Sequence, residues 1–437
     1  MPDGARRGRG MTGLRHGTEE VGASPATAGK RYHGMDFIRA VMMMLGVVLH
    51  TALVFMPEGW LYLDPQSSPF APLIAGLIHI FRMPVFFVMA GFFGAMLYQR
   101  RGIGAFSLHR FDRIVVPLVI GWFVLYPLLM WSISFAWTFS ARDPGPGVMI
   151  EAFRSTPLSV DFAEAGPMHL WFLYYLVYYY LFFAGLTWLL HRIARPVVGA
   201  SRRCVAALAT GRLSWSRLPL LVVLTAPAML CMSEPGIDTP FGFAPVWRIL
   251  ALYAVYFGVG WLVYAHREVV SRLEHLAWVR LVFACLLLGV AIILTAYHHH
   301  STANREAGEA IPDHATLFTV IQLVQVTGVW LLVLALTGVC ERVFRRPARP
   351  VRYLVDASYW IYLLHLPLTI FIPSLFRNWE IDGTLKMLLM MVLVTIPLLV
   401  TYHVFVRGTA IGSVLNGRRF PVWPFDGGRS DRSVPLE

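Results

Sequence analysis

The chain has 437 residues, of which 57% are hydrophobic and only 14% are charged. Soluble globular proteins carry about 25% charged residues, so the composition excludes that class and indicates an integral membrane protein. The formal net charge of +12 comes from arginines and lysines spread over several short segments, with no basic domain. Such a distribution argues against a nucleic-acid-binding surface.

The two ends of the chain differ in composition from the rest. Residues 1–34 are polar and basic and contain no apolar core, so they do not resemble a cleavable signal peptide, and the first apolar span is expected to remain as an anchor. Because the ends are rich in Gly, Arg, Ser and Pro, we predict a disordered cytoplasmic segment over 1–34 and a flexible cytoplasmic tail over 409–437. The membrane domain is then expected over 35–408.

Ten apolar stretches follow one another along this domain, and most reach the length of about 20 residues that a membrane-spanning helix needs. The fifth stretch is short. The predicted fold class is therefore all-α, a polytopic membrane protein with about ten transmembrane helices. The stretches are residues 36–56, 72–97, 114–137, 169–190, 216–232, 246–265, 278–297, 315–339, 353–376 and 385–406.

The distribution of positive charge predicts how these helices are oriented. With the N-terminus in the cytoplasm, the inner segments contain 28 arginines and lysines. The outer loops contain only four arginines, at positions 142, 154, 305 and 377. Cytoplasmic loops of membrane proteins are enriched in Lys and Arg, so we predict ten spans with both termini inside.

The cysteines and the histidine run suggest neither a disulfide framework nor a metal site. Cys204, Cys231, Cys285 and Cys340 all lie in predicted inner loops or spans, and none forms a CxxC pair. His298 to His300 form a run in a predicted outer loop, with no further ligand at a suitable spacing. We therefore expect no bound metal.

Two neighbouring helices each carry an arginine and a histidine on one face. Arg82, three residues after His79, is the only formally charged residue near the middle of a long apolar span. Ionisable groups at such depth are costly and usually functional, although a polar contact between helices is the alternative. Arg39 and His50 are eleven residues apart, which places them on one helix face about 16 Å apart along the axis.

Several histidines are predicted to lie at a similar depth in the outer half of the membrane. Counted from the span ends, His50 and His79 both lie about 10 Å below the outer surface and could face one another. His365 lies in the outer half of the ninth span, and His169 opens the fourth span beside Trp171. His169 equally fits an interfacial residue next to a belt of aromatic side chains.

A second set of basic residues is predicted at the cytoplasmic surface. Arg110 and Arg113 precede the third span, and Arg39 lies near the inner end of the first. Arg110 and Arg113 fit equally well as simple topology anchors. Together with the outer histidines, the three arginines mark a polar route from the cytoplasm to the outer half of the membrane.

Five sequence elements resemble the membrane-bound acyltransferase 3 family, over roughly residues 34 to 410. Ala90 stands where that family commonly has serine. The elements are Arg39 with His50, the phenylalanine-rich segment 86–93, Arg110 with Arg113, the stretch beginning at 169–171, and the late segment 358–365.

Within that family, the chain is most similar to the glucan biosynthesis protein C subgroup. The similar residues are 36–40, His50 with Trp60, 78–83 and 169–173. The resemblance implies transfer of succinyl groups, with acetyl as the alternative, to osmoregulated periplasmic glucans. It also implies a multi-pass protein of a bacterial inner membrane that uses succinyl-CoA or acetyl-CoA as donor co-substrate and has no bound cofactor. The expected partners are acyl-CoA, an extracytoplasmic polysaccharide and membrane lipid, with no nucleic acid.

The residues support a chemical role for each group. Imidazole has an unperturbed pKa of about 6.5 and is therefore suited to removing a proton from a sugar hydroxyl. His50 is the candidate base. His79 and Arg82 could stabilise the developing oxyanion, or Arg82 could instead hold a succinyl carboxylate. The predicted catalytic residues are His50, Arg39, His79 and Arg82, and the predicted substrate-binding residues are Arg110, Arg113, His169, Trp171 and His365.

Two other classes of protein remain open at this point. A transporter or flippase for a glycan or a lipid-linked sugar could use the same polar residues for binding alone. Such proteins often contain inverted repeats with paired broken helices, and no such pairing is visible in the sequence. A signalling or scaffold protein would not need arginine and histidine at matched depth.

Overall fold

The computed structural model falls into two units, residues 1–32 and 33–437, and the helices described below belong to the second. The predicted disordered segment lies almost entirely outside the described residues. The described residues are 32–163, 165–193, 217–266, 268–306, 314–346, 349–417 and 419–420.

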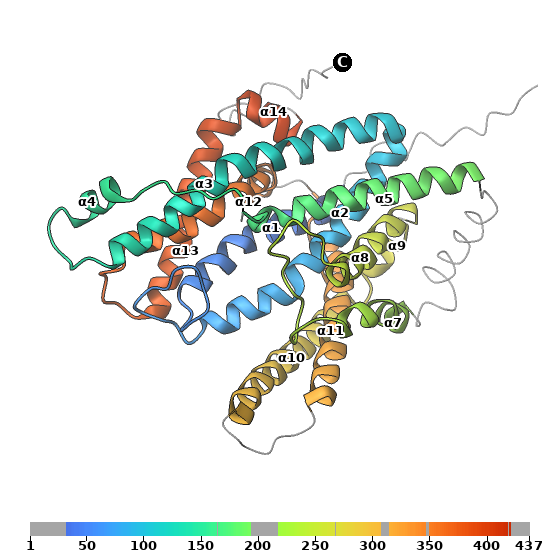
Figure 1. Cartoon of the computed structure of the whole chain (residues 1–437). Helices are drawn as coiled ribbons and strands as arrows, with labels where there is room; N and C mark the ends of the chain where they lie inside the picture. The colour runs from blue at the N-terminus through green and yellow to red at the C-terminus, as the bar shows by residue number, and fades with distance from the viewer. Residues whose placement is uncertain are drawn as a thin grey trace, which may run out of the picture. The chain divides into compact units, whose positions relative to one another are not determined.

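The described residues are helical and contain no β-strand, which confirms the all-α prediction (Figure 1). Two short π-helices and one 3-10 helix occur in addition to the α-helices. In chain order the elements are α1 (His33–Val54), α2 (Ala71–Arg110), the π-helix η2 (Phe111–Val115), α3 (Val116–Ser140), α4 (Val148–Ser155), the 3-10 helix η3 (Met168–Leu170), α5 (Trp171–Ile193), α7 (Arg217–Leu230), α8 (Trp247–Ala265), α9 (Glu268–Leu273), α10 (Ala277–Glu306), α11 (His314–Val343), α12 (Arg349–Leu375), α13 (Gly383–Thr401), the π-helix η5 (Tyr402–Val406) and α14 (Ala410–Asn416).

Eight helical segments within the described residues are long and apolar enough to cross a membrane. One of them, Ala71–Ser140, has 70 residues, far more than the roughly 20 that one crossing needs. It contains both the second and the third predicted spans, and its backbone turns sharply at Gly102, where φ is 72°. The fifth predicted span is helical only over α7, whose 14 residues extend about 21 Å. The protein is thus a polytopic helical membrane protein.

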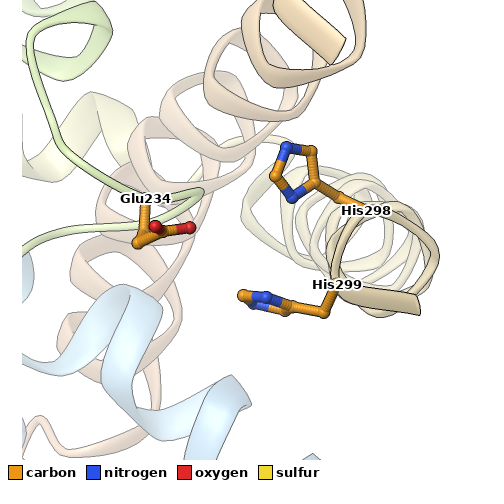
Figure 2. A group of neighbouring side chains, drawn as sticks. All are labelled: Glu234, His298 and His299. Carbon is orange, nitrogen blue, oxygen red and sulfur yellow. The ribbon is translucent and has the colours of Figure 1, made fainter. Parts of the chain in front are cut away.

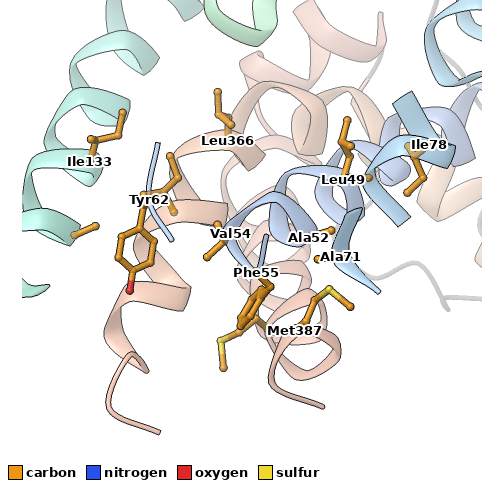
Figure 3. Packing of buried hydrophobic residues seen from close by; sticks show 14 of the residues in the cluster. Leu49, Ala52, Val54, Phe55, Tyr62, Ala71, Ile78, Ile133, Leu366 and Met387 are labelled. Atoms are coloured by element: carbon orange, nitrogen blue, oxygen red, sulfur yellow. The ribbon is translucent and has the colours of Figure 1, made fainter. Parts of the chain in front are cut away.

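Helix α1 occupies a central position among the helices, because it packs against α2, α11, α12 and α13. Its C-terminal end contributes Leu49, Ala52 and Val54 to a buried apolar cluster (Figure 3). Ile78 of α2 and Leu366 of α12 belong to the same cluster. This packing holds together the three helices that carry His50, His79 and His365.

The phenylalanine-rich segment of α2 is shaped for close contact with α8. A Cβ atom added at Gly91 would lie 2.0 Å from the carbonyl oxygen of Phe257, and one added at Gly260 would lie 2.0 Å from the carbonyl oxygen of Val88. Small residues allow helix backbones to approach closely inside a membrane, where packing drives helix association. Any larger residue at Gly91 would separate α2 from α8.

A buried ion pair fixes the loop between α1 and α2 against the start of α13. Lys386 Nζ lies 2.8 Å from Asp64 Oδ1, and both side chains are 0% exposed. Lys386 also donates to Gln66 Oε1 at 2.9 Å and to the carbonyl of Arg377 at 3.3 Å. Removing one partner of such a pair costs about 3–5 kcal/mol, because it leaves an uncompensated buried charge. The sequence analysis did not assign a role to Lys386.

Two boundaries differ from the sequence-based expectations. The sequence predicts a flexible tail from residue 409, whereas α14 forms a helix there with Gly412 and Leu415 buried. The histidine run at 298–300 is predicted in an outer loop, whereas α10 continues through it to Glu306. Helix α10 extends past its apolar stretch, because length and hydropathy mark only the part of a helix that lies in lipid; α14 is a separate helix that follows the turn at 407–409.

We predict that the topology has both termini on the cytoplasmic side, from the distribution of arginine and lysine. Reporter fusions after residues 150 and 307 should report an outer location, and fusions after 205 and 437 an inner one. Because α7 is short, the fusion after 307 is the most informative. If α7 does not cross the membrane, the fusions after 307 and 437 should both change side, to an inner and an outer location respectively, while those after 150 and 205 report as predicted.

Candidate active site

Three imidazole rings from distant parts of the chain meet beside α1. The ring of His50 in α1 lies 5.1 Å, centroid to centroid, from the ring of His365 in α12, which lies 5.0 Å from the ring of His169 in η3. We call these three residues the imidazole cluster. His365 is 1% exposed and His169 is also buried, whereas His50 is partly exposed. The structure thus places the ring of His365 beside that of His50, and the ring of His169 beside that of His365.

Hydrogen bonds to backbone carbonyls orient two of these rings. His365 Nδ1 donates to the carbonyl of Tyr362 at 2.7 Å, and His169 Nε2 donates to the carbonyl of Leu363 at 2.9 Å. In a neutral imidazole the other nitrogen is then an acceptor. Those nitrogens, together with His50 Nδ1, are buried without a hydrogen-bond partner among the described residues. The cluster can therefore accept hydrogen bonds from a bound hydroxyl group.

Arg82 reaches the imidazole cluster at Gly46, one helical turn before His50 in α1. A Cβ atom added at Gly46 would lie 2.8 Å from Arg82 Nη1 and 3.2 Å from His365 Nε2. The guanidinium of Arg82 and the imidazole of His365 thus both lie against the backbone of α1 at Gly46, which has no side chain. No role for Gly46 is predicted from the sequence. Its signal was a glycine four residues before His50, at a helix position where glycine costs about 1 kcal/mol relative to alanine.

We predict that Gly46→Ala strongly impairs activity without unfolding the protein. The added methyl group would displace the Arg82 guanidinium, and a misplacement of about 1 Å can cost about 100-fold in rate. Alanine itself favours the helix. The matched control is Gly76→Ala in α2, where an added Cβ would meet no atom within 4 Å. Acyl transfer by purified variants of equal thermal stability is the measurement; equal rates for both variants would contradict the prediction.

His79 lies one turn before Arg82 in α2 and is tied to a loop rather than to the cluster. Its Nε2 donates to the carbonyl of Ile237 at 3.0 Å, in the segment that connects α7 with α8. His79 is exposed and acts electrostatically on His50, as does Arg82. The sequence suggested that His50 and His79 could face one another, but the ring neighbours of His50 recorded among the described residues are His365 and Trp60.

Trp60 covers the His50 ring from the loop between α1 and α2. The two rings are stacked with their centroids 5.6 Å apart. The same loop carries Asp64, whose ion pair with Lys386 is described above. The buried pair thus helps to hold Trp60 over the imidazole of His50.

Trp171 lies among aromatic side chains rather than in the imidazole cluster. Its ring is 5.5 Å from Tyr175, 5.7 Å from Tyr253 and 6.3 Å from Phe87, and the residue is buried. These contacts join α5 to α2 and α8. Trp171 therefore packs α5 against α2, the helix that carries Arg82.

A second group of cationic side chains forms around the junction of α2 and α3. We call Arg39, Arg110 and Arg113 the inner arginine group, because their guanidinium groups lie close enough to interact electrostatically. The π-helix η2 begins directly after Arg110 and contains Arg113. Short π-helical segments are frequent at functional sites. Helix α1 links this group to the imidazole cluster, since Arg39 precedes His50 by about 16 Å along the axis.

Aromatic rings rather than carboxylates surround most of the inner arginine group. Arg110 lies over the ring of Tyr180 at 4.6 Å, and Arg39 lies over Phe93 at 5.1 Å. Arg39 also pairs with Asp36 at 3.4 Å. Neither Arg110 nor Arg113 has an ion pair with a carboxylate in the described part of the chain. The group therefore keeps a net positive charge and is suited to an anionic ligand.

Helices that can cross a membrane, imidazoles with accepting nitrogens and an arginine beside them define a multi-pass membrane protein equipped for acid–base chemistry. Residues 32–403 match the acyltransferase domain of the acyltransferase 3 family. The chain belongs to this family and is a membrane-bound O-acyltransferase, which sets aside the transporter and scaffold alternatives.

Curated relatives extend the similarity over nearly the whole chain. Glucans biosynthesis protein C of Salmonella paratyphi A and that of Salmonella agona (strain SL483) are each 25% identical over 399 residues, covering 89% of this chain and 95% of the relative. The protein of that name from Salmonella enteritidis PT4 is 24% identical over 394 residues. No solved structure matches the chain. The resemblance found in the motifs is thus confirmed.

Proposed function

We propose that the protein transfers an acyl group from a cytoplasmic acyl-CoA to a hydroxyl group of an extracytoplasmic glycan, such as an osmoregulated periplasmic glucan. Succinyl is the favoured acyl group and acetyl the alternative. The similarity to the glucans biosynthesis proteins C supports a glucan acceptor. A bacterial inner membrane is the expected location, because there the donor and the acceptor lie on opposite sides.

The observation that carries this proposal is the placement of two different sites along α1. The inner arginine group is cationic and suits the phosphates of coenzyme A. The imidazole cluster with Arg82, about 16 Å further along the helix axis, suits the reacting groups. The flexible pantetheine arm of the donor would connect the two. A binding protein for a glycan alone would have no use for the inner arginine group.

The proposed reaction uses His50 as the base. Its imidazole accepts the proton of the sugar hydroxyl while the oxygen attacks the thioester carbonyl, so a C–O bond forms and the carbonyl oxygen becomes negative. Arg82 stabilises that oxyanion, whereas the Nε2–H of His79 is already donated to the carbonyl of Ile237. The C–S bond then breaks, and the proton on His50 passes to the departing thiolate. His169 and His365 would accept hydrogen bonds from other hydroxyl groups of the acceptor sugar through their accepting nitrogens.

Arg82 has a second possible use that depends on the donor. A guanidinium can hold a carboxylate by two parallel hydrogen bonds, and a succinyl group carries such a carboxylate. Arg82 is only partly exposed, which strengthens a charged hydrogen bond relative to one in water. The two uses predict different donor preferences in Arg82 variants, as set out in the Discussion.

The experiment that tests the function is acyl transfer in isolated membranes. Membranes that contain the protein are incubated with succinyl-CoA or acetyl-CoA labelled in the acyl group and with a periplasmic glucan fraction. We expect label in the glucan, more from succinyl-CoA, and none with membranes that lack the protein. Label from neither donor would contradict the proposed donor and acceptor, and label from acetyl-CoA alone would contradict the succinyl preference.

A further inference from the structure

Three potential metal ligands meet near the C-terminal end of α10. They are the carboxylate of Glu234, in the segment between α7 and α8, and the rings of His298 and His299 in α10. One ligand atom from each lies within 4.8 Å of the other two. Figure 2 shows the carboxylate and both rings pointing toward a common space. The sequence did not reveal this group, because Glu234 is more than 60 residues from the histidine run.

Two ring nitrogens at this place lack the partners that buried polar atoms normally have. His298 is 8% exposed, and its Nδ1 is buried without a hydrogen-bond partner within the described residues. His314, which begins α11, places its ring 5.1 Å from that of His298, and its Nε2 is likewise unpartnered there. Buried polar atoms without partners are rare and call for an explanation such as a bound ion.

Hydrogen bonds to α11 fix the backbone of the segment that contains Glu234. The fully buried amide of Gln322 in α11 donates to the carbonyls of Met229 and Gly236 and accepts from the backbone N–H of Gly236. On the other side of the turn, Arg248 pairs with Asp238 at 2.8 Å. The backbone that carries Glu234 is therefore fixed opposite α10, which carries the two histidines. Such preorganisation of the ligands favours metal binding.

We propose that Glu234, His298 and His299 form a binding site for a divalent transition metal ion of the zinc class, with His314 as a fourth ligand. Two imidazoles and one carboxylate are a donor set that binds Zn²⁺. Imidazole nitrogen disfavours the hard cations Ca²⁺ and Mg²⁺, which prefer oxygen ligands. None of these ligands belongs to the imidazole cluster, so the proposed role of the metal is structural.

The geometry needs only side-chain rotation to complete the site. With metal–ligand bonds of about 2.0–2.2 Å, tetrahedral ligand atoms lie roughly 3.4 Å apart, against separations of up to 4.8 Å here. Glu234 and His299 are both exposed and can turn without disturbing the core. His298, which is buried, would keep its position and serve as the fixed ligand.

Metal binding at Glu234 would also affect the orientation of His79. Ile237, three residues later, accepts the hydrogen bond from His79 Nε2 at 3.0 Å. An ion held between Glu234 and α10 would fix this segment and so stabilise the orientation of His79. We expect metal binding to raise the thermal stability of the protein in addition to any effect on rate.

Zinc binding to the full-length protein in detergent tests the proposal, with an affinity tag that contains no histidine. The metal-free protein is titrated with Zn²⁺ in competition with a chromophoric chelator, and the melting temperature is recorded with and without zinc. We expect one tight equivalent and a raised melting temperature. Glu234→Gln and His299→Ala should each weaken binding by about tenfold or more, since even the loss of an outer-shell partner costs about 10–100-fold.

The matched control is His300→Ala, because His300 belongs to the same run but not to the three-ligand group. This variant should bind zinc within about twofold of the unaltered protein. Weak, non-stoichiometric binding by the unaltered protein would overturn the proposal. It would also be overturned if Glu234→Gln bound zinc normally, or if His300→Ala lost as much affinity as His299→Ala, because the histidine run alone would then be the binding element.

Discussion

His50→Ala should abolish measurable acyl transfer while the protein still inserts and folds. A general base contributes about 100-fold to 10,000-fold to a rate, and the nearest rings of His50 belong to Trp60 and His365, which would remain in place. His50→Gln should fail as well, since an amide cannot take up the proton. The measurement is transfer of labelled acyl groups to glucan by washed membranes that contain equal amounts of each variant.

The matched control for this test is His191→Ala. His191 is an exposed histidine near the end of α5 whose Nδ1 donates to the carbonyl of Thr187, so its loss should leave the rate unchanged. Full acylation by His50→Ala would remove His50 from the mechanism. In that event His365, which presents an unpartnered Nε2 beside Arg82, would be the next candidate base.

Arg82→Lys should impair the enzyme severely although it keeps the positive charge. Lysine has no planar fork of donors, so it cannot form two parallel hydrogen bonds to a carboxylate or reach both sides of an oxyanion. The loss of one oxyanion donor typically costs about 100-fold to 1,000-fold in rate. The measurement is the rate with succinyl-CoA and with acetyl-CoA for Arg82→Lys and Arg82→Met.

The two donors separate the two roles of Arg82. If Arg82 holds the carboxylate of a succinyl group, Arg82→Lys should slow succinyl transfer much more than acetyl transfer. If Arg82 stabilises the oxyanion, both rates should fall together, because every thioester develops the same charge. Unchanged rates with both donors would show that Arg82 only fills space between α1 and α2, and the candidate site would then shrink to His50 and Arg39.

Features that repeat along one helix were predictable from the sequence. The shared face of Arg39 and His50 follows from the 3.6-residue period, and α1 is continuous over both residues. The neighbouring positions of His79 and Arg82 on α2 follow in the same way. Depth arguments matched His50 with His79 and put His365 in the outer half of the membrane, but they did not show that His365 and His169 lie beside His50.

Partners supplied by loops and by helix crossings were not predictable. Gly46 matters because of what approaches it from α2 and α12, and nothing in its own surroundings in the sequence names Arg82. Trp171 was expected among substrate-binding residues but packs against Tyr253 and Phe87. Lys386 lies at the end of an apolar stretch, where an interfacial location would be the ordinary expectation, yet it is fully buried against Asp64.

The sequence by itself determined the class of fold, the family and the faces of α1 and α2 on which charge is buried. These depend on hydropathy, helical period and the high cost of placing charge in hydrocarbon, all of which act locally along the chain. Only the tertiary structure decided which groups meet, such as His365 with Arg82 at Gly46, or Glu234 with His298. The reason is that such contacts depend on how helices cross and where loops return, and these are set by packing between segments far apart in the sequence.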